Sequence, residues 1–276
     1  MSGQLAAVRA IGVRPDACPV YRTIVAVDLE GSTKRTNPVK GELRWVMYAL
    51  LDQALEAAGI GRRHLEQLVD RGDGVLILIR PDDDVPKTVV LGRLIPMLAA
   101  LLAEHNAAVD RPELGLRLRA VVHAGEVHDD GRGFYGDDLD FAFRLLDAPT
   151  VKRVLREAAG SPLVLVVSDE IFSGIVRHGY LSADPYRPTV RVRVGGRHRR
   201  GWVHVPVPVA VGRPAIRRAM VPLQLSTPLS IAAMNGAGQD RPQAAAVARG
   251  RDAVRPPGLR PVPGVNGNEG PRSGRG

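Results

Sequence analysis

The stretch Val27-Asp28-Leu29-Glu30-Gly31-Ser32-Thr33 places a carboxylate where an apolar segment ends and a polar turn begins. The segment before it, Arg22–Leu29, is rich in β-branched and apolar residues, which predicts a buried strand. The polar run that follows predicts a turn leading toward a helix. The end of this first strand is therefore a candidate functional site.

A second acidic turn, Asp70-Arg71-Gly72-Asp73-Gly74, lies between two short apolar runs. The runs Leu65–Val69 and Val75–Ile79 predict the two strands of a hairpin around it. Between the first strand and this hairpin, Gly41–Ala58 has apolar residues at helical spacing. The chain thus begins with the order strand, helix, strand, strand.

The pattern continues with a second helix, Thr88–Asn106, which Pro96 is expected to kink. A strand at Leu114–Val122 and a helix at Asp137–Leu146 follow. The resulting β-α-β-β-α-β order predicts an α+β fold with a ferredoxin-like core. Further elements are expected at Leu163–Val167 (strand), Asp169–Arg177 (helix), Val190–Val194 (strand) and Trp202–Val205 (strand).

In such a core, right-handed crossovers put the first and third strands side by side at the sheet centre. Asp28 and Asp73 are then expected to meet at one end of the sheet. Two carboxylates there offer hard oxygen ligands for Mg²⁺ or Mn²⁺, and the Leu29 carbonyl could add another. Gly31 and the N–H groups of Ser32 and Thr33 could form a phosphate-binding turn.

Each acidic turn alone is more simply explained as an ordinary turn, because Asp-Gly is common in hairpins. The joint placement of both carboxylates favours a metal site. Two metal ions held there could activate a hydroxyl group and neutralise a leaving pyrophosphate. No Gly-x-x-x-x-Gly-Lys-Ser/Thr loop occurs, which excludes a P-loop enzyme.

The composition limits the kinds of metal site and the cellular location that are possible. Cys18 is the only cysteine, which excludes an intrachain disulfide and a thiolate metal cluster. We see neither a signal peptide in the first 20 residues nor an uninterrupted apolar run of 18 residues, so a cytoplasmic protein without a membrane span is expected.

The net charge of +9 is concentrated toward the C-terminus: residues 211–276 contain ten Arg and three acidic residues, and the first 210 residues have a net charge of only +2. We expect an N-terminal extension (1–19), a folded domain (20–210) and a disordered Pro/Gly/Arg-rich tail (211–276). A solvated tail is favoured over a nucleic-acid-binding arm.

Four motifs, in this order, resemble the class III adenylate and guanylate cyclases. Val27–Thr33 resembles the first metal motif of that family, and Arg71-Gly72-Asp73-Gly74-Val75-Leu76 resembles the second. Val121–Val127 is similar to the next strand and turn, and Tyr135–Leu145 resembles the transition-state helix. The likeness covers roughly residues 20–208 and continues through Ser168-Asp169-Glu170-Ile171 to Arg200-Gly201-Trp202-Val203.

The resemblance implies that a nucleoside triphosphate is converted to a 3′,5′-cyclic nucleotide and pyrophosphate. Asp28 and Asp73 would hold two metal ions per active site, with residues 29–33, including Glu30, around the nucleotide. Arg144 would stabilise charge on the transferring phosphoryl group. Arg200 stands near the position of a phosphate-contacting Lys in the family. The family builds its sites across a head-to-tail homodimer, so Arg144 would act on the triphosphate held by the partner subunit.

Two departures from the family pattern leave alternatives open. The transition-state helix usually has Asn four residues before the Arg, and this position is Asp140 here. Asp140 could instead pair with Arg144 at i, i+4 spacing. Val69 and Gly133 stand closest to the base-selecting positions and match neither purine type, so a pyrimidine cyclase of the anti-phage type stays open. The alternative function is a catalytically silent cyclase-like module that binds a nucleotide or a partner.

Overall fold

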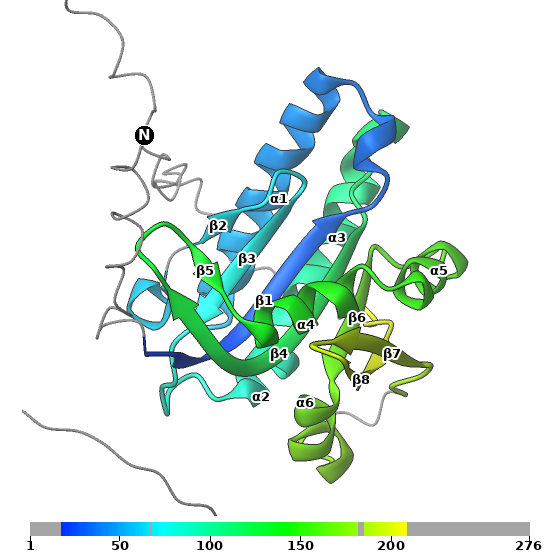
Figure 1. Cartoon of the computed structure of the whole chain (residues 1–276). Coiled ribbons are helices and arrows are strands. Elements are labelled where there is room, and N and C mark those ends of the chain that lie inside the picture. Colours follow the sequence, from blue (N-terminus) through cyan, green and yellow to red (C-terminus); the bar gives the residue numbers. More distant parts are fainter. Residues whose placement is uncertain (1–17, 67, 182–184, 209–276) are drawn as a thin grey trace, which may run out of the picture. The chain divides into compact units, whose positions relative to one another are not determined.

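A computed structural model describes residues 18–66, 68–181 and 185–208. Its centre is a mixed sheet in the order β2-β3-β1-β4-β6-β8-β7, with β5 paired to the far end of β4 (Figure 1). The strands are β1 (Val20–Leu29), β2 (Val69–Asp70), β3 (Gly74–Ile79), β4 (Leu118–Asp129), β5 (Phe134–Tyr135), β6 (Leu163–Ser168), β7 (Thr189–Val194) and β8 (Arg197–His204).

The helices form two layers, one on each face of the sheet. Figure 1 shows α1 and α3 side by side on one face, whereas α4 packs across the other. The helices are α1 (Asn37–Ala57), α2 (Lys87–Val89), α3 (Ile95–Ala108), α4 (Asp137–Leu146), α5 (Pro149–Glu157) and α6 (Asp169–Gly174). The ferredoxin-like β-α-β-β-α-β core of an α+β fold, predicted from the sequence, is confirmed.

Alternation along β1 explains why both faces of the sheet are apolar. Val25 and Val27 point into the core under α1 and α3, whereas Ile24 and Ala26 point into the core under α4. All four side chains are buried, as expected for a central strand covered on both faces. Asp28 continues the second series, so its side chain belongs to the α4 face.

The structure refines several predicted boundaries. The helix at Asp137–Leu146 has the predicted bounds, but the strand expected at Leu114 begins at Leu118. A π-helical turn, Val90–Leu94, precedes Pro96 in the long helical segment. Because proline has no N–H to donate to the carbonyl four residues earlier, a regular α-helical bond is missing at this wide turn. The short helix α5 was not predicted.

The helical segment Lys87–Ala108 is long and apolar enough to cross a membrane by length and composition. Its apolar residues include Val90, Leu94 and Leu98, which are buried in the core between the segment and the sheet. This burial gives its apolar character a structural explanation within the domain. The predicted N-terminal extension, apart from its last two residues, and the predicted disordered tail lie outside the described residues.

Candidate functional site

Asp28 and Asp73 meet at one end of the sheet. Strands β1 and β3 are antiparallel, with Asp28 directly opposite Gly74. The Leu29 N–H donates to the Asp73 carbonyl at 3.0 Å, which joins the end of β1 to the β2–β3 turn. The two carboxylates, 45 positions apart in sequence, are therefore brought to adjacent backbone positions.

Gly74 makes this close approach feasible. A Cβ atom added at position 74 would lie 2.4 Å from the Val27 carbonyl oxygen, far inside van der Waals contact. Any larger residue would push β3 away from β1 and carry Asp73 away from Asp28. The glycine of the Asp-Gly turn thus determines the geometry of the carboxylate pair as well as the turn.

Arg119 is a residue of this site that the sequence analysis missed. It lies directly opposite Asp28 in the β1–β4 register, and its Nη2 forms an ion pair with Asp28 Oδ2. Only 12% of the Arg119 side chain and 20% of the Asp28 side chain are exposed. Burial lowers the pKa of Arg119, and its Nε has no hydrogen-bond partner among the residues that the structure describes. A built-in cation therefore occupies one side of the predicted metal ligand.

The turn after β1 is short and begins at a glycine. Gly31 has φ of 70°, in the left-handed region that favours glycine, and a single 3₁₀ turn spans Ser32–Lys34. Ser32 is buried and Thr33 is exposed. Glu30 instead forms an ion pair with Arg117 at 3.0 Å. Because Arg117 also donates to the Ala158 carbonyl, Glu30 contributes to a contact that holds the sheet end together.

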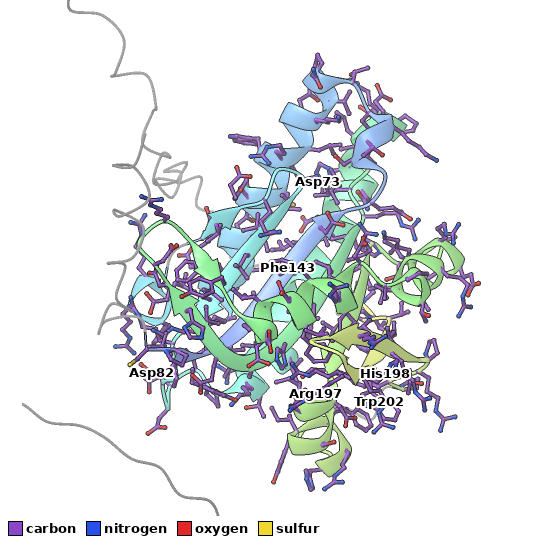
Figure 2. All side chains as sticks on the ribbon, in the orientation of Figure 1. Asp73, Asp82, Phe143, Arg197, His198 and Trp202 are labelled. Carbon is purple, nitrogen blue, oxygen red and sulfur yellow. The ribbon has the colours of Figure 1, made fainter. Side chains whose placement is uncertain are left out.

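Helix α4 carries Asp140 and Arg144, both exposed. They do not form the ion pair that their i, i+4 spacing allowed, unlike Arg153 and Glu157, whose charged atoms are 3.2 Å apart at the same spacing. The pairing interpretation of Asp140 and Arg144 is therefore wrong. Between them in sequence is Phe143, whose ring centre lies 3.9 Å from the Arg71 guanidinium. This contact connects α4 to the turn that holds Asp73; Figure 2 labels Phe143 and Asp73.

Arg200, which was expected to contact a phosphate, instead contacts Asp169 and Trp202 of its own domain. Its Nε and Nη2 donate to Asp169 Oδ1 at 3.1 and 2.9 Å, and its guanidinium lies over the Trp202 ring. It comes from β8, two strands beyond β4 in the sheet order, so the described structure does not bring it to Asp28 and Asp73.

A buried polar chain fixes the start of α4. His123, fully buried, contacts Ser168 Oγ through Nδ1 at 2.8 Å and Asp138 Oδ1 through Nε2 at 3.1 Å. The Glu126 N–H and Arg199 also donate to Asp138. The hydrogen bond from His123 is the main reason that the pKa of Asp138 falls well below its usual range.

The order Ser168, His123 and Asp138 matches that of a hydrolase triad, but the arrangement is structural. Ser168 is fully buried, and its Oγ accepts the Ile171 N–H as the N-cap of α6. A nucleophile must be reachable by substrate, and this hydroxyl is not. The role of His123 is therefore structural.

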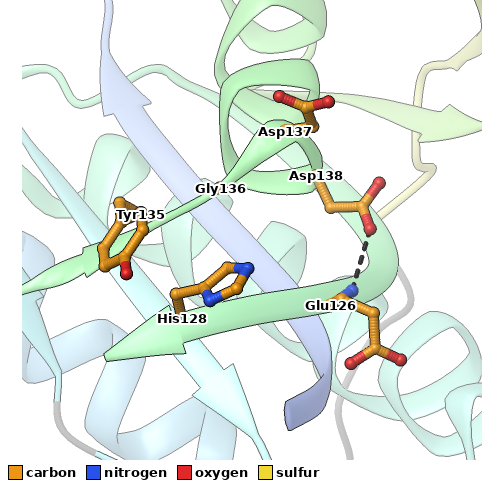
Figure 3. A pocket seen from close by; sticks show the side chains of 6 residues that line it. All are labelled: Glu126, His128, Tyr135, Gly136, Asp137 and Asp138. Atoms are coloured by element: carbon orange, nitrogen blue, oxygen red, sulfur yellow. Dashed lines mark hydrogen bonds between the residues drawn. The ribbon is translucent and has the colours of Figure 1, made fainter. Parts of the chain in front are cut away.

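An acidic hollow of about 450 Å³ opens beside the hydrogen-bonded side chains of His123 and Asp138 (Figure 3). It lies where β4, β5 and α4 meet, and Glu126, His128, Tyr135 and Asp137 are among its lining residues. The neighbouring end of β1 is Val20–Tyr21, the opposite end from Asp28. The hollow is therefore separate from the carboxylate pair.

Another acidic group, His64 with Asp82 and Asp84, brings potential metal ligands together. Arg63 already supplies a cation there: its Nε lies 2.8 Å from His64 Nε2 and its Nη2 lies 2.5 Å from Asp84. The Gly61 N–H donates to His64 Nδ1. Both ring nitrogens of His64 thus face N–H donors, Gly61 at Nδ1 and Arg63 at Nε2, which disfavours metal binding through either nitrogen.

Comparison with solved structures finds cyclases. The guanylyl cyclase Cya2 is 15% identical, with a TM-score of 0.49 over 71% of this chain and 98% of that one. An adenylate/guanylate cyclase/hydrolase from Silicibacter pomeroyi is 21% identical, with a TM-score of 0.48 over 68% and 98%. The adenylyl cyclase CyaB from P. aeruginosa is 15% identical, with a TM-score of 0.46 over 68% and 95%. No family model and no curated protein matches the chain.

Proposed function

We propose that the chain is a class III-like nucleotide cyclase that converts a nucleoside triphosphate to a 3′,5′-cyclic nucleotide and pyrophosphate. The observation that carries this proposal is the β1–β3 register, which sets Asp28 opposite Gly74 and bonds Leu29 to Asp73. Two carboxylates from distant motifs at one sheet end are an arrangement suited to holding divalent cations. The four motifs described above support the same assignment.

The residues present fit Mg²⁺ or Mn²⁺. The proposed donors are the carboxylates of Asp28 and Asp73 and the Leu29 carbonyl, all of them hard oxygen ligands. Asp73 has no ion-pair partner among the described residues, whereas Asp28 is paired with Arg119. Two bound metal ions would activate the attacking hydroxyl and stabilise the leaving pyrophosphate.

The remaining roles belong to side chains around the carboxylate pair. The turn Gly31-Ser32-Thr33 would bind phosphate oxygens through its N–H groups. Arg144, exposed on the last turn of α4 and unpaired in the described part of the chain, would stabilise negative charge on the transferring phosphoryl group. We propose that it does so across a head-to-tail homodimer. Arg200 would serve only if its contact with Asp169 opened.

The test is incubation of the purified full chain with each of the four ribonucleoside triphosphates and Mn²⁺. The proposal predicts pyrophosphate and a cyclic nucleotide from at least one of them, which would also identify the base, purine or pyrimidine. No product from any triphosphate at high protein concentration would overturn the enzymatic proposal.

A second candidate function is a silent cyclase-like module that binds a nucleotide or a partner protein. Two observations favour it. Arg119 already neutralises Asp28. Asp140, which has no ion-pair partner within the described ranges, presents a carboxylate where a triphosphate would need neutral or positive neighbours. Under this alternative the protein would bind a nucleotide with Mn²⁺, for example in equilibrium dialysis, without releasing pyrophosphate.

A further inference from the structure

The folded part of the chain contains a segment that is rich in arginine and lacks acidic residues. Residues 185–208 include six Arg and no Asp or Glu, whereas residues 1–184 have a net charge of −4. The net charge of the first 210 residues, +2, hides this separation. Assigning the basic charge to the tail alone is therefore incomplete, since the last two strands, β7 and β8, carry a local positive charge of their own.

The register of β7 and β8 collects part of this charge on one face. Val190, Val192 and Val194 pack against the core under α4, so the alternate residues of β7 face the other way. On that outer face, Arg191 lies opposite Arg200 and Arg193 lies opposite His198. We call these four residues the arginine ribbon; Figure 2 labels His198, with Arg197 and Trp202 close to it in the view. Same-face neighbours along a strand are about 6.8 Å apart.

Internal partners do not neutralise the ribbon. Among the described residues, neither Arg191 nor Arg193 has an acidic group within ion-pair distance, and Arg200 alone is paired, with Asp169. Like charges directly across two strands destabilise a sheet. Charge on an edge strand can protect against aggregation, which would explain β7. At His198 and Arg200, β8 pairs with β7 alone, because β6 pairs with β8 only from Gly201 to His204. The four residues therefore lie on a two-stranded extension of the sheet.

We propose that the arginine ribbon binds the phosphate backbone of double-stranded nucleic acid. Arginines spaced along a two-stranded ribbon can contact successive phosphates, and such a ribbon fits a duplex groove. Single-stranded binding needs open aromatic faces for base stacking. The aromatic residue beside the ribbon, Trp202, stacks on Phe172 at 3.9 Å and has Arg200 over its ring. Its ring faces are already used, which favours a duplex.

The test measures binding of the full chain to a fluorescent 20-base-pair duplex DNA by anisotropy over a series of salt concentrations. Each phosphate contact contributes about −0.9 to the slope of log affinity against log salt. Arg191→Gln with Arg193→Gln is expected to weaken binding at least about tenfold at 0.1 M salt and to reduce the slope by about 2. The matched control is Arg153→Gln with Arg156→Gln on α5, two exposed arginines off the ribbon, and it should bind like the unaltered chain.

Three outcomes would overturn the proposal. The ribbon variant could bind the duplex as well as the control does, which would assign binding to other basic residues, including those of the tail. Its defect could be equal or larger on a single strand of the same sequence. Its defect could instead appear only with anionic lipid vesicles. Circular dichroism of both variants verifies folding, and none of these results depends on cyclase activity.

Discussion

The acids at the end of β1 and the arginines of β7 differ in how their charges are paired. At the end of β1, the acids Asp28 and Glu30 are each paired with an arginine from the β4 side, Arg119 and Arg117. On the ribbon, Arg191 and Arg193 have no acidic partner within the described residues. Acids that are already balanced must exchange a partner in order to bind a cation, whereas unbalanced arginines can accept an anion directly. The first region is suited to conditional metal binding and the second to an external polyanion.

The largest expected effect concerns the geometry of the carboxylate pair. Gly74→Ala would place a Cβ atom 2.4 Å from the Val27 carbonyl oxygen. We expect a loss of about 3 kcal/mol in the free energy of unfolding, because β1 and β3 must separate. Chemical denaturation measures it. Gly61→Ala is the control, because nothing lies within 4 Å of its added Cβ, and equal losses in both variants would contradict the close-approach explanation.

The second effect concerns the attachment of α4 to the sheet. Asp138→Asn removes a carboxylate that accepts from His123, Arg199 and the Glu126 N–H, and should cost about 2 kcal/mol at pH 7. The folded-state pKa of Asp138 lies below its unfolded value of 3.8, so its contribution is complete above that pH and is lost as the pH falls below it.

Thermal melts at pH 7 and near pH 2.5 measure this dependence. The difference between the unaltered chain and Asp138→Asn should shrink at the lower pH. Asp137→Asn, one residue earlier and exposed, should change little at either pH. A difference that persists unchanged in acid would show that charge on Asp138 is not the stabilising feature.

The third effect tests whether the ion pair with Arg119 limits metal binding at Asp28. Arg119→Gln should tighten Mn²⁺ binding about tenfold, because a cation next to the incoming metal ion is removed and Asp28 is released. Electron paramagnetic resonance of free Mn²⁺ reports the affinity. Arg44→Gln releases Asp70, a carboxylate of the same hairpin, and serves as the control. Unchanged or weaker Mn²⁺ binding in Arg119→Gln would show that the ion pair with Asp28 does not limit metal binding.

The smallest expected effect is on catalysis at Asp140. Asp140→Asn removes an exposed negative charge beside the proposed triphosphate site and should raise the rate of pyrophosphate release about threefold. Steady-state kinetics with the best triphosphate measures it, with Asp137→Asn as the reference for loss of a charge on the same helix. A fall in rate would mean that Asp140 has a positive role in the reaction.

Patterns along the chain were sufficient to predict much of this molecule. Periodicity predicted α4 with its observed bounds, and topology predicted that Asp28 and Asp73 would meet. The ion pair between Arg119 and Asp28 was not predictable without the strand register, because the residues are 91 positions apart. Pairing of Arg144 with Asp140 was wrong because spacing permits a contact without determining side-chain direction.

Averaging explains another difference between expectation and structure. The near-neutral charge of residues 1–210 combined an acidic first part with an arginine-rich last part, so the β7–β8 segment was not recognised as basic. Helix α5 was missed because its buried residues, Val151 and Leu155, form a short apolar pattern in a charged segment. Net charge counted over shorter segments indicates the basic β7–β8 segment, and Pro149 is a start signal for helix α5.

The most direct test of the central claim is Mn²⁺-dependent pyrophosphate release by three matched variants. If Asp28 and Asp73 hold the metal ions, Asp28→Ala and Asp73→Ala should each reduce the rate at least about 100-fold. Asp70→Ala, which alters the same hairpin three positions from Asp73, should keep most of the activity. Full activity in either Asp28→Ala or Asp73→Ala would contradict the account.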